Sequence, residues 1–291
     1  MKHLAMSFAA AQLLSVSALA LVSSNSFAFP GWDRNLPPAP ESADFASPYD
    51  YSGIVALSNC SGSLVRFDDS QDEDKALVLT NGHCTGTIEP GTVRYKESAN
   101  RTFDLLNAAG GKLGKVTTNQ LVYATMTKSD MALYALNETY AVIVKKFGIQ
   151  ALTVSRTQPA VETAIEVISG YWKRGYSCSI ETISFGLQEG RWNFESSIRY
   201  SRPGCDVIGG TSGSPVIEAG TRTVVAINNS GNQDGLQCKV NNPCEIDADG
   251  GIIFKKGYSY AQQTYWLYSC RTEAGVLDFT LPGCVLPKPR V

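Results

Sequence analysis

The sequence predicts an all-β body with one short helix near its carboxy terminus. From Gly53 onward, apolar runs rich in β-branched and aromatic residues alternate with clusters of Gly, Asn, Asp and Ser, a spacing typical of a sandwich or a closed barrel. Sustained helical periodicity is scarce, and residues 261–269 are the best candidate for a helix. The expected strands are 54–57, 63–67, 76–80, 121–126, 131–136, 164–172, 179–187, 192–200, 215–217, 223–228 and 252–260.

The first 52 residues have a different character. Lys2 and His3 precede an apolar run over 4–22 and a small-residue stretch that ends at Ala28. This pattern is typical of a secretory signal over residues 1–28, and it predicts export to a periplasm or to the extracellular space. Residues 29–52 contain five prolines among small and acidic residues and are expected to be a leader or pro-segment without helix or strand.

Charge and cysteine content limit the possible partners. Lys and Arg together number 25, Asp and Glu 27, so the net charge is −2 and no basic excess points to nucleic acid. No later apolar run is long enough to cross a bilayer, and a monomer is expected. The eight cysteines follow an export signal and predict disulfides, for which 105 pairings exist. The exported chain has no Cys-x-x-Cys pair and one histidine, so no metal site is expected.

Two acidic segments, 68–74 and 247–250, lie between expected strands. Neither has the spacing of a known calcium loop, so both are interpreted as solvated turns, with calcium binding as the weaker alternative.

The most specific motif is Gly-Gly-Thr-Ser-Gly-Ser-Pro-Val over residues 209–216. Flanking glycines permit a tight turn that exposes the hydroxyl of Ser212 and aims the N–H groups of Gly210 and Ser212 at one point, as a nucleophile and its oxyanion hole require. The motif alone is equally compatible with a Gly/Ser-rich loop.

His83 ends the apolar run 76–80 and adjoins Cys84. It is the one histidine beyond the signal, so it alone could remove the proton of a serine at neutral pH. A bridge from Cys60 to Cys84 would fix its backbone. A lone histidine can also be an ordinary packed or surface residue.

Asp130 opens the apolar run 131–136. A carboxylate there could accept the second ring N–H of His83 and stabilise the imidazolium, or it could simply cap a strand.

The order His83, Asp130, Ser212, set in Thr-Asn-Gly-His-Cys, Asp-Met-Ala-Leu and Gly-Thr-Ser-Gly-Ser-Pro, resembles the chymotrypsin-like serine peptidases. The resemblance implies two antiparallel six-stranded barrels, over residues 53–150 and 151–269, and a disulfide-linked tail over 270–291 is expected after them. The tail over 270–291 lies beyond the resemblance, and its role is left open. The resemblance also implies His83 as general base, Asp130 as its orienting partner, Ser212 as nucleophile and the amides of Gly210 and Ser212 as oxyanion hole. No cofactor is implied, and the partners are protein or peptide substrates.

The motif departs from the animal digestive members of that family, because Thr211 stands where they have an aspartate and no Ile-Val-Gly-Gly sequence precedes Gly53. Gly-Gly-x-Ser-Gly-Ser-Pro-Val is similar instead to the bacterial secreted glutamyl endopeptidases. Those enzymes have a histidine in the pocket strand, which this chain lacks over 226–231, so a glutamate preference is not implied.

For the specificity pocket the resemblance points to Asp206, Asn228, Asn229 and Ser230. A buried Asp206 would favour cleavage after Lys or Arg. Because Cys205 precedes it directly, Asp206 could instead satisfy local backbone donors.

Proximity in sequence suggests three further bridges, Cys178–Cys205, Cys238–Cys244 and Cys270–Cys284. The predicted function is that of an exported serine endopeptidase. A catalytically silent binding protein of the same fold is the alternative, and an esterase is disfavoured because no histidine follows Ser212.

Overall fold

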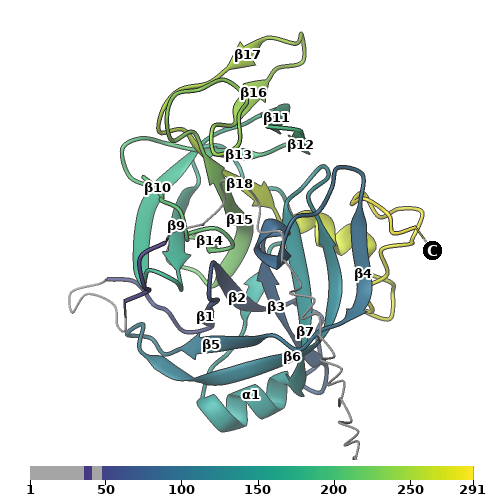
Figure 1. Cartoon of the computed structure of the whole chain (residues 1–291). Helices are drawn as coiled ribbons and strands as arrows, with labels where there is room; N and C mark the ends of the chain where they lie inside the picture. The colour runs from purple at the N-terminus through teal and green to yellow at the C-terminus, as the bar shows by residue number, and fades with distance from the viewer. Residues whose placement is uncertain (1–35, 41–47, 291) are drawn as a thin grey trace, which may run out of the picture.

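Six strands of the amino-terminal half form a closed ring (Figure 1). The computed structural model describes residues 36–40 and 48–290, so the expected signal over 1–28 lies outside the described residues. The antiparallel ring β1–β5–β6–β7–β3–β2 closes where β1 pairs with β2. Its strands are β1 (Ile54–Ala56), β2 (Ser61–Arg66), β3 (Lys75–Thr80), β5 (Thr102–Leu106), β6 (Lys112–Thr125) and β7 (Met131–Thr139), while β4 (Val93–Ser98) pairs with β6 outside it.

The carboxy-terminal half forms a second closed ring, β15–β14–β9–β10–β13–β18, in which β15 also pairs with β18. Its strands are β9 (Ala164–Ser169), β10 (Arg174–Ile183), β13 (Ile198–Tyr200), β14 (Pro215–Glu218), β15 (Thr223–Gly231) and β18 (Ser259–Gln263). A three-residue strand, β8 (Leu152–Val154), pairs in parallel with β2 and with β15 and so joins the rings. The two antiparallel six-stranded barrels expected from the sequence are confirmed.

A separate four-stranded sheet projects from the second ring (Figure 1). It contains β12 (Trp192–Glu195), β11 (Gly186–Glu189), β16 (Cys244–Ile246) and β17 (Ile252–Ile253) in that order. Cys238–Cys244 closes the loop that enters β16.

Three strand predictions were wrong in their extent. The segments 179–187, 192–200 and 252–260 were each expected to be one strand, but each contains parts of two. The second breaks at Ser196, which has a positive φ of 50° without being glycine. The first breaks where the chain leaves β10 for the projecting sheet at Ser184 and Phe185. The break at Ser196 has neither Gly nor Pro to announce it, whereas the break within 252–260 contains Gly257, which has a positive φ of 86° and is a turn signal.

The short carboxy-terminal helix is present, but it begins later than the predicted range of 261–269. Ala261 lies in β18, and a 3-10 turn follows at Tyr265–Cys270. The one α-helix among the described residues is α1 (Tyr140–Phe147). The side chain of Thr139 accepts a hydrogen bond from the N–H of Val142 at 3.3 Å, and Gly148 ends the helix with a left-handed φ of 68°. None of the described helical segments combines the length and apolar character that a membrane crossing requires.

The acidic segment 68–74 is a turn whose carboxylates face arginines. Asp69 pairs with Arg271 at 2.5 Å. A hydrogen bond from Arg156 lowers the pKa of Asp68 below its usual value. These contacts agree with the interpretation of the segment as a surface turn.

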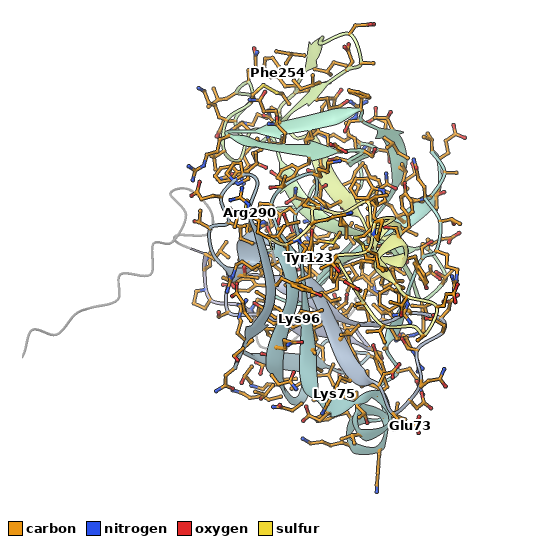
Figure 2. All side chains as sticks on the ribbon, turned by 90° about the vertical axis from the view of Figure 1, so that its right-hand side faces the viewer. Glu73, Lys75, Lys96, Tyr123, Phe254 and Arg290 are labelled. Carbon is orange, nitrogen blue, oxygen red and sulfur yellow. A yellow bond between two sulfur atoms is a disulfide. The ribbon has the colours of Figure 1, made fainter. Side chains whose placement is uncertain are left out.

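The carboxy-terminal tail packs on the first ring beside β4 and β6 (Figure 1; Tyr123 and Arg290 are labelled in Figure 2). The Cys270–Cys284 bridge closes it. Phe279 is fully buried and stacks on Tyr123 with ring centroids 3.9 Å apart, and the Tyr123 hydroxyl donates to the carbonyl of Pro287 at 2.9 Å. The tail therefore extends the core of the first barrel.

We predict that Phe279→Ala lowers the free energy of unfolding by about 3–5 kcal/mol, because it empties a buried aromatic site. Urea unfolding followed by tryptophan fluorescence measures the change. Val276→Ala in the same tail removes an exposed side chain and should stay within about 0.5 kcal/mol of the wild type. Equal effects of the two substitutions would show that the tail does not contribute to the core.

Candidate active site

His83 and Asp130 form a buried pair at the ends of two neighbouring strands. His83 follows β3 in a 3-10 turn, and Asp130 immediately precedes β7, the partner of β3. The Nδ1 of His83 lies 2.7 Å from Oδ2 of Asp130, and the backbone N–H of His83 donates to Oδ1 at 3.0 Å. Asp130 is fully buried. Both carboxylate oxygens of Asp130 therefore contact His83, one at its ring and one at its backbone.

Gly82 makes this approach possible. A Cβ at position 82 would lie 2.1 Å from the carbonyl oxygen of Thr125 and 2.9 Å from Oδ1 of Asp130. Only glycine fits between these groups, so the Asn-Gly-His sequence has a packing reason. The side chain of Asn81 donates to the backbone carbonyl of Asp130 at 2.8 Å and fixes the aspartate from the other side.

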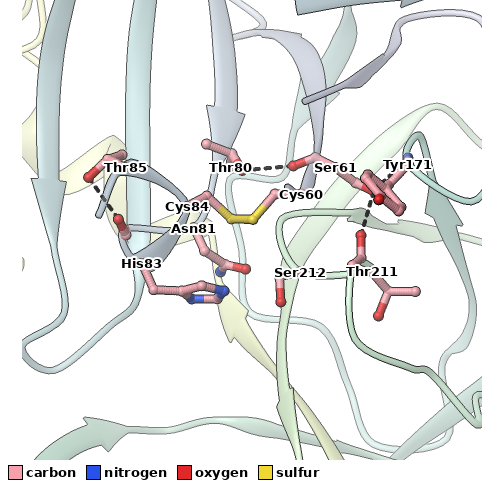
Figure 3. The surroundings of a disulfide bond; sticks show 12 residues. Cys60, Ser61, Thr80, Asn81, His83, Cys84, Thr85, Tyr171, Thr211 and Ser212 are labelled. Atoms are coloured by element: carbon pink, nitrogen blue, oxygen red, sulfur yellow. Dashed lines mark hydrogen bonds between the residues drawn. A yellow bond between two sulfur atoms is a disulfide. The ribbon is translucent and has the colours of Figure 1, made fainter. Parts of the chain in front are cut away.

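All four disulfide pairings expected from the sequence are present in the structure: Cys60–Cys84, Cys178–Cys205, Cys238–Cys244 and Cys270–Cys284. The first bridge, with an S–S distance of 2.00 Å, ties the residue before β2 to the residue after His83 (Figure 3). The sulfurs of Cys60 and Cys84 lie near a ring nitrogen of His83, but they are joined to each other and are not thiolate ligands for a metal.

Ser212 lies in a turn that faces the histidine. Figure 3 shows the imidazole of His83 pointing toward Ser212 across the gap between the two rings. The Ser212 hydroxyl donates to the carbonyl of Asn229 on β15 at 3.3 Å. At Gly213 φ is +79°, and a Cβ there would lie 2.2 Å from the carbonyl oxygen of Ser61. The glycine after the serine is thus required by the close approach of the first ring.

Two carbonyl groups of the turn that carries Ser212 are engaged within the protein. The carbonyl of Gly209 accepts from the indole N–H of Trp172 at 2.6 Å, and that of Thr211 accepts from the Asn228 side chain at 3.1 Å. In a trans peptide the N–H points opposite to its carbonyl, so the N–H groups of Gly210 and Ser212 point away from Trp172 and from the Asn228 side chain. Among the described residues neither N–H donates a hydrogen bond. Two donors are therefore available for an oxyanion.

Ser61 connects this turn to the histidine side, and sequence analysis did not single it out. Its N–H donates to the carbonyl of Ser212 at 2.8 Å, and its own carbonyl accepts from the Thr80 hydroxyl at 2.7 Å (Figure 3). Its hydroxyl donates to the carbonyl of Gly210 at 3.2 Å and accepts from the N–H of Tyr171 at 3.0 Å. A serine at the start of a strand has no local signal for such a role.

A cavity of about 850 Å³ opens beside Ser212. Asp206 lines it, but its side chain is 59% exposed and pairs with Arg202 at 3.4 Å. The expected buried carboxylate at the floor of the pocket is therefore wrong: Asp206 lies in an exposed loop after Cys205, where water and Arg202 solvate it. Lys256 lines the same cavity, so cations outnumber the carboxylate there.

The other three expected pocket residues, Asn228, Asn229 and Ser230, all line this cavity. The amide of Asn228 is engaged within the protein, because its Nδ2 donates to Thr211 and its Oδ1 accepts from the Tyr200 hydroxyl at 3.0 Å. The buried amide of Asn229 has no hydrogen-bond partner among the described residues.

Sequence analysis missed a buried carboxyl, that of Glu189, which lies near Ser230 of β15. Glu189, at the end of β11, is fully buried and its Oε1 accepts from the N–H of Asn241 at 2.7 Å. Burial raises the pKa of Glu189 from 4.5 to about 7, and hydrogen bonds from Ser230 and the Asn241 backbone offset part of that rise.

The model of the trypsin-like peptidase domain family matches residues 60–227 of the chain. No curated protein matches by sequence.

Several solved structures resemble this one at low sequence identity. The MamO protease domain from Magnetospirillum magneticum has 12% identity and a TM-score of 0.48, with 78% of this chain and 99% of that chain covered. The Nocardiopsis protease has 13% identity and a TM-score of 0.42, covering 74% of this chain and 92% of its own. The protease Anisep from Arthrobacter nicotinovorans has 15% identity and a TM-score of 0.43, covering 75% and 92%.

We predict that Glu189→Gln stabilises the protein more at pH 8 than at pH 4.5. Because the pKa of Glu189 is raised in the folded state, its contribution to the free energy of unfolding is fully present below pH 4.5 and is lost as the pH rises through about 7. Glutamine does not ionise, so the variant avoids this loss. The raised pKa corresponds to a loss of about 3 kcal/mol in the free energy of unfolding of the wild type between these pH values. Chemical denaturation at both pH values measures it.

Glu218→Gln makes the same chemical change at an exposed position and should show no such pH dependence. A pH-independent difference between the wild type and Glu189→Gln would contradict the raised pKa.

Proposed function

The chain belongs to the trypsin-like peptidases, and from this premise we propose that it is a serine endopeptidase using Ser212, His83 and Asp130. The observation that carries the proposal is the contact of 2.7 Å between Nδ1 of His83 and the buried carboxylate of Asp130, with the ring pointing toward Ser212. A carboxylate on Nδ1 leaves Nε2 to accept a proton, which is the tautomer that a general base requires.

In the proposed reaction the hydroxyl oxygen of Ser212 attacks the carbonyl carbon of the scissile peptide while His83 takes the hydroxyl proton. The buried carboxylate of Asp130 stabilises the imidazolium that forms. Collapse of the tetrahedral intermediate passes that proton to the leaving amine and leaves an acyl group on Ser212. Water then attacks the ester, with His83 again as base, and releases the acid.

The N–H groups of Gly210 and Ser212 are the proposed donors to the oxyanion. Their support is the orientation of the turn, whose carbonyls are held on the opposite side by Trp172 and Asn228. Donors that are already oriented need no reorganisation during the reaction, and removing one such donor from an enzyme typically costs about 10²–10³ in kcat.

We also propose that the chain works as a monomer outside the cytoplasm, after removal of residues 1–28, with halves at 53–150 and 151–269. Four disulfides in the structure fit an oxidising compartment.

Specificity is proposed to come from the cavity beside Ser212 rather than from Asp206. Cleavage after Lys or Arg, the preference expected from the sequence, would need an unpaired buried carboxylate. Asp206 is instead exposed and paired with Arg202, and Lys256 stands in the same cavity. The buried amide of Asn229 is a neutral group there with hydrogen-bonding capacity left for a substrate.

We predict that Ser212→Ala and His83→Ala each abolish measurable peptide hydrolysis, because loss of either group costs about a millionfold in subtilisin. Asp130→Asn should lower kcat about 10⁴-fold by favouring the wrong tautomer. Hydrolysis of a mixed peptide library by the purified exported form measures these changes. A fluorophosphonate probe should label the wild type but not Ser212→Ala, and a wild type that resists labelling would instead favour a silent binding protein.

We predict that Asp206→Asn changes kcat/KM by less than about fivefold and equally for substrates with basic and neutral residues before the cut, because an exposed ion pair contributes little. A panel of peptides that differ at this one residue measures the ratio. A selective loss for Lys and Arg peptides would restore Asp206 as the specificity residue.

A further inference from the structure

Part of the proline-rich leader lies against the active site. Residues 36–40 have no regular secondary structure, yet Leu36 lines the same cavity as Ser212. The Cδ1 of Leu36 lies 3.2 Å from the point where a Cβ on Gly210 would stand. Gly210 supplies one of the proposed oxyanion donors, so the leader reaches the edge of the reaction centre.

The turn after β9 provides hydrogen bonds for this segment. The hydroxyl of Tyr171 donates to the carbonyl of Pro37 at 2.8 Å, and the ammonium of Lys173 donates to the carbonyl of Pro40. Both side chains are buried, with 5% and 8% of their surface exposed. Trp172, between them, holds the carbonyl of Gly209. One turn therefore binds the leader and orients the oxyanion loop.

Tyr49, nine residues after Pro40, also contacts the body of the protein. The hydroxyl of Tyr49 lies 2.9 Å from that of Ser177 on β10. The ring of Tyr49 covers Gly175 so closely that a Cβ there would lie 2.1 Å from a ring carbon. Successive leader residues thus contact positions 171, 173, 175 and 177 in order, and the body has a glycine where the tyrosine ring needs one.

The bound segment differs from a substrate in its backbone. Peptides that add to a strand edge pair through their N–H groups, and Pro37 and Pro38 have none. The prolines also restrict the free chain, so docking costs little conformational entropy. The segment is held by its carbonyl groups and by the side chain of Leu36. Such an occupant can block the site without pairing with a strand edge as a substrate peptide would.

We propose that Leu36–Pro40 is an intramolecular inhibitor, docked in a peptide-binding subsite formed by Tyr171, Lys173 and Gly210. The subsite takes an apolar side chain followed by proline, and release of the leader opens it to substrate. This proposal rests on the proposed peptidase function. It assigns the leader a role in regulating access to Ser212.

The test compares Leu36→Asp with Leu36→Met in the full exported chain. A carboxylate cannot be buried against Gly210 without cost, whereas methionine keeps an apolar side chain of similar volume. We expect Leu36→Asp to be labelled by the fluorophosphonate probe and to hydrolyse peptides at least about fivefold faster than the wild type, the scale set by partial burial of one leucine. Leu36→Met should stay within about twofold of the wild type.

A second measurement does not depend on catalysis. A fluorescent peptide of sequence Leu-Pro-Pro-Ala-Pro should bind the double variant Leu36→Asp/Ser212→Ala more tightly than Ser212→Ala alone, whose subsite is already occupied by the leader. A peptide with Asp in place of Leu is the matched control and should bind neither protein.

The outcomes separate the two proposals. If all variants are labelled at the same rate and the peptide binds neither protein, the inhibitor is refuted and the peptidase stands. If no variant is labelled but the peptide binds the double variant selectively, the docking subsite stands and the peptidase fails. Loss of selective binding together with absent labelling overturns both.

Discussion

The hydrogen bonds of Ser61 hold the two halves of the candidate active site in register. Through its N–H and its carbonyl, this fully buried residue links the turn of Ser212 to the strand that leads to His83. Its hydroxyl fixes the carbonyl of Gly210 and the turn at Tyr171. The neighbouring Cys60–Cys84 bridge ties the same point to His83. Ser61 is thus a central link in setting the relative position of base and serine, and loss of its hydroxyl would leave buried groups at Gly210 and Tyr171 without this partner.

The residues that could be recognised in the sequence are those with a local signal. His83 and Asp130 stand at the ends of apolar runs, and Ser212 lies in a glycine turn, so chain order and neighbours were enough to group them. Ser61 and Glu189 have no such signal, because their surroundings come from segments far away, such as Ser169 beside Ser61 at a separation of 108 residues. Asp206 lines the expected cavity, but no pattern could reveal that its carboxylate faces solvent.

The fold was predictable to a similar extent. Runs of β-branched residues and the resemblance predicted two barrels. The structure shows each barrel closed by strand pairing into a ring. One strand was predicted too long where the chain turns without glycine or proline, at Ser196. The helix α1 was not predicted, and its Val-Ile-Val sequence is more typical of a strand. The cap at Thr139 and the left-handed Gly148 determine that helix locally, against the propensity of its central residues.

The strand β8 has a mechanical consequence. Because its three residues pair with Val65 and Arg66 of one ring and with Thr223 and Val224 of the other, both rings belong to a single continuous sheet. The turn of Ser212 leads into β14 and His83 follows β3, so both residues are attached to this one sheet. Moving the rings apart would break the ladder hydrogen bonds of β8, so we expect a polypeptide to gain entry through movement of peripheral segments over this frame.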